Sequence, residues 1–279
     1  MQLQQKKGIK CHFLKISFLY ILFYSLSNII LCNDVADSDN VNLSEYTQES
    51  LFVSLGSYCE PAQMLRHCGM RKVAFPFDWL VSFDGEALIK ILANNFAHFL
   101  DEKYFMVHDV GSGSLLHTHY RLEFLHDGDW RDKGYVSNMQ QFIPKYTRRI
   151  DRFRQLQDYS GKVIFIRAAY IYSLTDPHRY YKVAENVEIT PESSLKLYNI
   201  LKKFFPKLNF SLIIINTHDR KEKEIEEEAC VFENIRRFRA NPSRELLDVP
   251  EQVAAYRAFF TKLLNEKEIF LIIFTFSYC

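Results

Sequence analysis

Two short segments, the apolar run 163–166 and the run 210–215, which is apolar except at Ser211, constrain the fold of this chain most strongly. A strand that is apolar at every position needs cover on both faces, and strands of a parallel sheet between helical layers have such cover. A third apolar segment, residues 51–55, leads into a glycine turn. We therefore expect these three segments to be strands of a mostly parallel sheet.

Segments with helical periodicity lie between and after the apolar runs. Apolar residues recur at helical spacing in 84–100 and 142–156, and further helices are expected after Thr190-Pro191 and from the capping-box pattern at 248–251 through Leu264. The alternation of strands and helices with short connections favours an α/β fold with three layers, in which helices flank the sheet. We expect this fold as a single domain over residues 51–279.

The remaining segments give weaker signals. Residues 104–118 have an irregular pattern, whereas 120–125 alternates as a strand does. The charge run 220–228 predicts an exposed helix or loop, and the apolar residues 269–279 predict a last strand. The helix over 142–156 carries basic residues away from its apolar stripe, on faces that we expect to be solvated: Lys145, Arg148, Arg149, Arg152 and Arg154.

The N-terminal region differs from the rest of the chain. An uncharged, apolar stretch over residues 16–32 follows a lysine-rich start and precedes a polar, acidic segment. This order is typical of a secretory signal peptide, and the stretch is slightly shorter than the ~20 residues of a spanning helix. We expect a signal peptide or membrane anchor over 1–32, a linker over 33–50, and an exported domain that is secreted or extracytoplasmic.

Charge and cysteine spacing exclude other classes. The chain has 35 Lys and Arg against 34 Asp and Glu, a net charge of +1, so no global field attracts nucleic acid. The six cysteines include no Cys-x-x-Cys pair and match no zinc motif. We therefore expect neither a metal nor a cofactor, while the disulfide pairing and the oligomeric state stay open.

Cys59 follows the first expected strand and its glycine turn, directly before an expected helix from Pro61 to His67. The backbone N–H groups and the dipole of a helix N-terminus favour a thiolate over a thiol. This position predicts a cysteine nucleophile. A small buried residue at a strand–helix junction is the alternative.

The motifs around Cys59 resemble a known family. Ser54-Leu-Gly-Ser-Tyr-Cys59, Leu65-Arg-His-Cys-Gly-Met-Arg71 and Pro76-Phe-Asp-Trp79 are similar to successive motifs of the papain-like cysteine peptidases catalogued as domain of unknown function 1796. His126-Asp127 and the run 163–166 are similar to later motifs of that family. The resemblance covers roughly residues 51–217, and it implies hydrolysis of a peptide or another acyl substrate.

Hydrolysis by a cysteine needs a thiolate, a histidine base and a group that orients the imidazole. We expect Cys59 as the nucleophile and His126 as the base, because His126 ends an expected strand. His117, His119 and His218 are the alternatives for the base. The orienting carboxylate is Asp78 or Asp127, and Asp127 qualifies only if the chain turns there, because successive side chains of a strand point to opposite faces.

The oxyanion of the acyl intermediate also needs hydrogen-bond donors. Papain-type enzymes use a glutamine several residues before the cysteine, and no glutamine occupies residues 51–58. The backbone N–H groups of Cys59 and Glu60 can take this role at the start of a helix.

Two other functions remain open at this stage. Asp127-Gly-Asp129 has the Asp-x-Asp form with which many glycosyltransferases hold a cation and a nucleotide sugar. The alternative is therefore a glycan-related α/β domain, either transferase-like or binding-only, with a structural Cys59. An exported interaction domain without catalysis is the third hypothesis.

Overall fold

A computed structural model describes residues 43, 50–57, 59–82, 85–107, 113–124, 126–127, 130, 134–170, 189–217, 225–228, 232, 234–240, 253–254 and 256–264. All of them belong to one compact unit, Val41–Cys279. The predicted signal or anchor over 1–32, most of the predicted linker, the last strand over 269–279, Asp129 and His218 lie outside the described residues. None of the described helices is long and apolar enough to cross a bilayer.

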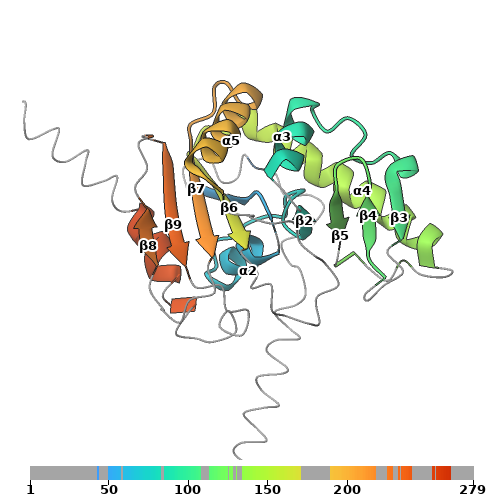
Figure 1. Ribbon diagram of the computed structural model, residues 1–279, viewed down its shortest axis with the longest axis horizontal. Helices are drawn as coiled ribbons and strands as arrows, with labels where there is room; N and C mark the ends of the chain where they lie inside the picture. Colours follow the sequence, from blue (N-terminus) through green and yellow to red (C-terminus); the bar gives the residue numbers. More distant parts are fainter. Residues whose placement is uncertain are drawn as a thin grey trace, which may run out of the picture. The chain divides into compact units, whose positions relative to one another are not determined.

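The larger sheet has the strand order β1-β6-β7-β9-β8 (Figure 1). Four of its strands run parallel, and β8 is antiparallel to β9. The three strands predicted from apolar runs are its β1, β6 and β7. The bounds are β1 Leu51–Ser54, β6 Val163–Tyr170, β7 Phe210–Thr217, β8 Glu226–Glu228 and β9 Ile235–Ala240.

Apolar clusters cover both faces of this sheet. Val163 and Phe165 of β6 belong to the cluster that also contains residues of α3, α4 and α5. Ile164 and Ile166, which point to the opposite face, pack with α2 and with residues of the helix over 256–264. The domain is therefore a mixed α/β domain with helices on both faces of its sheet. The helices are α2 Glu60–His67, α3 Gly85–Ala93, α4 Gly134–Gln155 and α5 Pro191–Phe204.

A second sheet is antiparallel and has the order β2-β5-β4-β3. Its strands have three residues each, which is too short for a clear alternating pattern. The irregular pattern predicted over 104–118 is therefore wrong for β3 and β4. The bounds are β2 Leu80–Ser82, β3 Phe105–Val107, β4 Leu115–His117 and β5 Leu122–Phe124, with short 3-10 helices at η3 Glu102–Tyr104 and η4 Leu156–Asp158.

The polar face of α4 is not fully solvated, contrary to the prediction. Arg149 and Arg152 are buried, at 1% and 5% exposure. The Arg152 guanidinium donates to the carbonyl of Ala74 at 2.5 Å, and that of Arg149 lies over the Tyr146 ring at 5.1 Å. Arg152 thus connects α4 to the loop before β2, a contact between distant segments that helical periodicity does not encode.

The end of the charge run 220–228, which was predicted to be an exposed helix or loop, is a strand. Residues 226–228 form β8, an edge strand paired with β9. Glu227 and Glu228 of β8 pair with arginines of β9, so the charges of both strands are matched across the ladder. β9 was not predicted, because three of its six residues are arginines and only Ile235 and Phe238 are large and apolar, which gives no strand pattern in the sequence.

Candidate active site

Cys59 lies just after a strained turn between β1 and α2. Gly56 has φ +69° and Ser57 has φ +93°, and the second value is uncommon for a residue with a β-carbon. The Gly56 N–H donates to Ser54 Oγ at 3.1 Å. A β-carbon at position 56 would lie 2.6 Å from the carbonyl oxygen of Phe77, so the turn needs glycine here.

The second sheet and β6 hold this turn in place. Ser57 forms a bridge with Val81, and the Ser82 N–H donates to the Ser57 carbonyl at 3.2 Å. Arg167, which is 1% exposed, donates to the Leu55 carbonyl at 2.7 Å and to Ser82 Oγ at 2.8 Å. One guanidinium therefore connects the end of β1 with β2.

Cys59 is the N-cap residue of α2 and already has helical dihedrals, φ −69° and ψ −16°. Its carbonyl accepts the first helical hydrogen bond, from the Gln63 N–H at 2.9 Å. Its side chain forms no disulfide, is 5% exposed, and belongs to neither apolar cluster of the described residues. The position at the helix start agrees with the expectation from sequence.

Cys68, at the other end of α2, has a different environment. It is not disulfide-bonded, and it packs in the apolar cluster with Met64 and Leu65. Burial raises the pKa of its thiol to about 11, against the opposing effect of Arg257. We therefore expect the Cys68 thiol to react slowly, which makes Cys68 a natural control for Cys59.

His126 packs against Trp79, with their ring centroids 5.9 Å apart in an edge-to-face arrangement. The guanidinium groups of Arg66 and Arg71 lie 5.5 Å and 5.3 Å from the centroid of the same indole. The imidazole is exposed and the indole is half-buried. The structure thus brings His126 together with residues of the Arg66–Trp79 motifs that precede it by about fifty residues.

Asp78 is buried and accepts hydrogen bonds from Arg71 Nε and from the Phe75 N–H, both at 3.0 Å. Its carboxylate also lies 3.0 Å from Arg71 Nη2 in an ion pair. Burial raises the pKa of this carboxyl, and the Arg71 charge and the Phe75 N–H act in the opposite direction. Asp78 therefore fixes Arg71, which in turn lies over Trp79.

Asp127 is directed towards α4. Its carboxylate accepts a hydrogen bond from the Tyr146 hydroxyl at 2.8 Å and pairs with Lys145 at 3.0 Å. The pKa of Tyr146 is well above its ordinary value, chiefly because its hydroxyl is buried and secondly because the Asp127 charge is close. These contacts hold the chain directly after His126, and they occupy the first carboxylate of the Asp127-Gly-Asp129 motif.

The alternative bases have other surroundings. His117 is buried, its Nε2 lies 3.0 Å from the His98 carbonyl, and its Nδ1 accepts from the Tyr120 N–H at 3.2 Å. Both ring nitrogens therefore serve the packing of the second sheet. His119 is exposed and packs on Tyr104 with ring centroids 4.8 Å apart.

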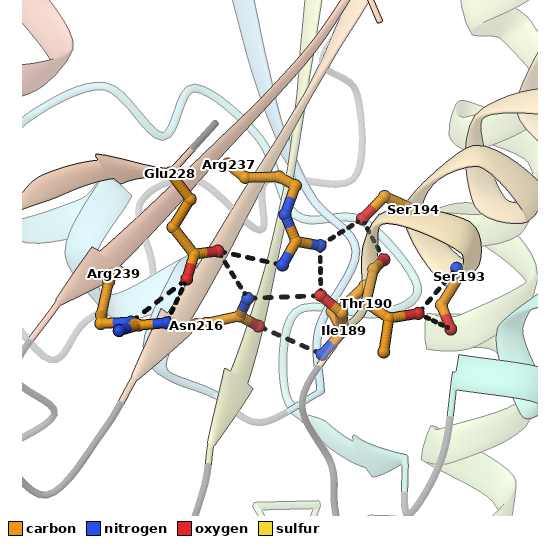
Figure 2. Close-up of polar contacts among 8 residues, drawn as sticks. All are labelled: Ile189, Thr190, Ser193, Ser194, Asn216, Glu228, Arg237 and Arg239. Atoms are coloured by element: carbon orange, nitrogen blue, oxygen red, sulfur yellow. Dashed lines mark hydrogen bonds and ion pairs between the residues drawn. The ribbon is translucent and has the colours of Figure 1, made fainter. Parts of the chain in front are cut away.

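A polar network lies at the carboxyl ends of β7 and β9 (Figure 2). These strands are parallel to β1, so the network occupies the same edge of the sheet as the turn before Cys59. Glu228 pairs with Arg237 at 3.0 Å and with Arg239 at 2.8 Å. The same network fixes the start of α5 through contacts among Ile189, Ser194, Asn216 and Arg237.

A cavity of about 330 Å³ lies elsewhere in the domain, and no residue predicted for catalysis lines it. Across the described part of the chain, no group of His, Cys, Asp and Glu side chains is arranged to hold a metal ion. The residues around the cavity come from α4 and the turn after α3: Phe96, His98, Leu100, Asp101, Thr147, Ile150, Asp151 and Arg154.

Arg167 and Arg66 contact residues of the site motifs, although the sequence predicted a site role for neither. Arg167 contacts a residue 112 positions away, so only the pairing of β1 with β6 brings it there. Arg66 could have been found, because it follows Cys59 by seven residues and therefore lies on the same helical face. The catalytic roles assigned to Cys59, His126, Asp78 and Asp127 remain predictions.

Comparison with known proteins agrees with the motifs. A family model described as "Putative papain-like cysteine peptidase (DUF1796)" matches residues 50–220. Uncharacterized protein R408 of Acanthamoeba polyphaga mimivirus is 31% identical over 139 residues, which are 43% of this chain and 62% of the relative, so the chain spans less than two thirds of that protein. No solved structure matches. Because the family model covers more than half of the chain, the chain belongs to the family described as "Putative papain-like cysteine peptidase (DUF1796)".

Proposed function

We propose that this chain is a cysteine hydrolase in which Cys59 attacks the acyl carbon of a peptide or a related amide. The observation that carries the proposal is the position of Cys59, at the N-cap of α2 after a strained turn. The helix start favours the thiolate, and its N–H groups are suited to a developing oxyanion. Membership of a family described as peptidases supports the same chemistry.

The proposed reaction has two steps. The Cys59 thiolate forms a C–S bond to the acyl carbon, the C–N bond breaks, and the leaving amine takes a proton from the His126 imidazolium. Water then attacks the thioester and gives one proton to the imidazole, the C–S bond breaks, and the carboxylic acid leaves while the Cys59 thiolate and the His126 imidazolium are restored. Asp78 and Asp127 act in this proposal as positioning residues, Asp78 through Arg71 and Trp79, and Asp127 through the chain next to His126.

Alkylation with iodoacetamide tests the nucleophile. The intact chain is treated near pH 6, and peptide mass spectrometry measures the labelling rate of each cysteine. We expect Cys59 to react and Cys68 to remain unlabelled, because a thiol with a pKa of about 11 has almost no thiolate at that pH. A Cys59 that reacts no faster than Cys68 contradicts the proposal.

Hydrolysis of a fluorogenic peptide library tests the reaction itself. Cys59→Ser is expected to lose activity by at least about 1,000-fold, while the matched variant Cys68→Ser keeps it. His126→Gln is expected to lower kcat at neutral pH and to slow the alkylation of Cys59. Activity that survives Cys59→Ser would show that another residue carries the chemistry.

A further inference from the structure

Cys59 and Arg66 lie on the same face of α2. Seven residues of helix turn through about 700°, which returns to within about 20° of the starting direction, and they advance by about 10 Å. Cys59 has helical dihedrals, so this geometry applies from the N-cap onward. The residues that pack in the apolar cluster, Met64, Leu65 and Cys68, occupy the opposite side of the helix.

The Arg66 guanidinium is held over the indole of Trp79, 5.5 Å from its centroid. Stacking on an aromatic ring restricts the rotamers of an arginine and leaves its in-plane N–H groups available to an anion. Arg66 makes no ion pair with any residue that the structure describes, and it is half-exposed.

Among the described residues around the Trp79 indole, Arg66 is the arginine without an ion pair. Arg71 also lies over the Trp79 ring, but its charge is paired with the Asp78 carboxylate, whose Oδ2 lies 3.0 Å from Arg71 Nη2. His126 contacts the same indole and adds positive charge when it is protonated. An anionic group placed here would meet the Arg66 guanidinium, the Trp79 ring and the His126 imidazole.

We infer that Arg66, supported by Trp79, binds a carboxylate of the substrate, so that the substrate class is an acidic peptide. This inference rests on the proposed function. An extended peptide advances by about 3.3 Å per residue. The separation of about 10 Å between Cys59 and Arg66 along the helix therefore corresponds to an Asp or Glu about three residues from the reacting carbonyl.

Peptide chloroacetamides with Glu or Gln three residues before or after the reactive residue test this inference. Their labelling rates at Cys59 are compared at pH 7 and low salt, with iodoacetamide as a reagent without a peptide. In the wild type we expect one Glu probe to react about tenfold faster than its Gln partner. The difference should shrink at 0.5 M salt, because ions screen the half-exposed guanidinium.

Variants of Arg66 separate charge from folding. Arg66→Gln should remove the Glu preference, Arg66→Lys should keep part of it, and Arg66→Glu should favour a probe with Lys at the same position. Lys203→Gln on α5 removes an equal charge at an exposed position and should keep the preference. The Lys203→Gln control should retain the iodoacetamide rate of the wild type, and the labelling rates of each Arg66 variant with the peptide probes are divided by the iodoacetamide rate of that same variant.

The outcomes of this experiment are distinguishable from those of the proposed function. Iodoacetamide labelling of Cys59 without a Glu preference overturns the inference alone, and so does a preference that persists in Arg66→Gln. Absence of Cys59 labelling by iodoacetamide contradicts the proposed function and the inference together.

Discussion

Gly56 and Phe77 are packed so closely that a β-carbon at position 56 would lie 2.6 Å from the Phe77 carbonyl oxygen. Gly69 also has a positive φ, +72°, but an added β-carbon there meets nothing within 4 Å. The two glycines have nearly the same positive φ and differ in the space around them. They therefore separate the cost of the left-handed backbone from the cost of a steric clash.

We expect Gly56→Ala to lower the free energy of unfolding by roughly 3 kcal/mol, and Gly69→Ala by about 1 kcal/mol. Urea denaturation of the two variants measures both values. Gly56→Ala should also slow the alkylation of Cys59, because the clash displaces the turn that carries this residue. Equal unfolding free energies for the two variants would mean that the loop around Phe77 adjusts without cost.

The strands and helices with long apolar patterns could be predicted from sequence, since β1, β6, β7 and the stripes of α4 and α5 depend on local periodicity. β9 could not, because its three arginines are matched by Glu227 and Glu228 of β8, a partner that only the folded sheet supplies. The same applies to the site. The position of Cys59 follows from a local motif. Arg167, in contrast, contacts Leu55 in the turn before Cys59 only because β1 pairs with β6, and these two residues are 112 positions apart in the sequence.

Asp78 and Arg71 form a buried ion pair whose two partners depend on each other. Asp78→Ala leaves the guanidinium of Arg71 buried without its carboxylate, so we expect the free energy of unfolding to fall by about 3–5 kcal/mol. The double variant Asp78→Ala with Arg71→Met should recover part of this loss. Urea denaturation of the wild type, the two single variants and the double variant measures the coupling free energy between Asp78 and Arg71. Additive effects of the two substitutions would contradict the dependence.

The buried His117 predicts a loss of stability in acid. Burial lowers the pKa of this imidazole, with a smaller contribution from His119, while the His98 carbonyl and the Asp101 charge act in the opposite direction. The unfolded chain therefore takes up this proton at a higher pH than the folded chain does. The stabilising contribution is complete above pH of about 6.5 and is lost as the pH falls towards the folded pKa.

We expect the free energy of unfolding to decrease by up to about 1.4 kcal/mol per pH unit from this one proton. Urea denaturation between pH 7.5 and 5 measures the slope. His117→Gln keeps a donor and an acceptor and should flatten it, whereas His126→Gln, which removes an exposed imidazole and keeps the buried one, should not. An unchanged slope in His117→Gln would assign the acid sensitivity to another group.

Arg167 connects the end of β1 to β2 with two donors of one planar group, 2.7 Å from the Leu55 carbonyl and 2.8 Å from Ser82 Oγ. A lysine carries its donors on a single nitrogen and cannot reach both acceptors in this geometry. Arg167→Lys should therefore lower the free energy of unfolding by about 1–3 kcal/mol and slow the alkylation of Cys59.

The matched variant Ser82→Ala removes one acceptor and keeps the guanidinium on Leu55. We expect a smaller loss of about 1 kcal/mol and a nearly unchanged alkylation rate, because the turn before Cys59 keeps its contact with Arg167. Denaturation and alkylation measured on the same samples distinguish the two effects. If Arg167→Lys destabilises the fold without changing the rate at Cys59, the bridge supports the sheets and does not position the nucleophile.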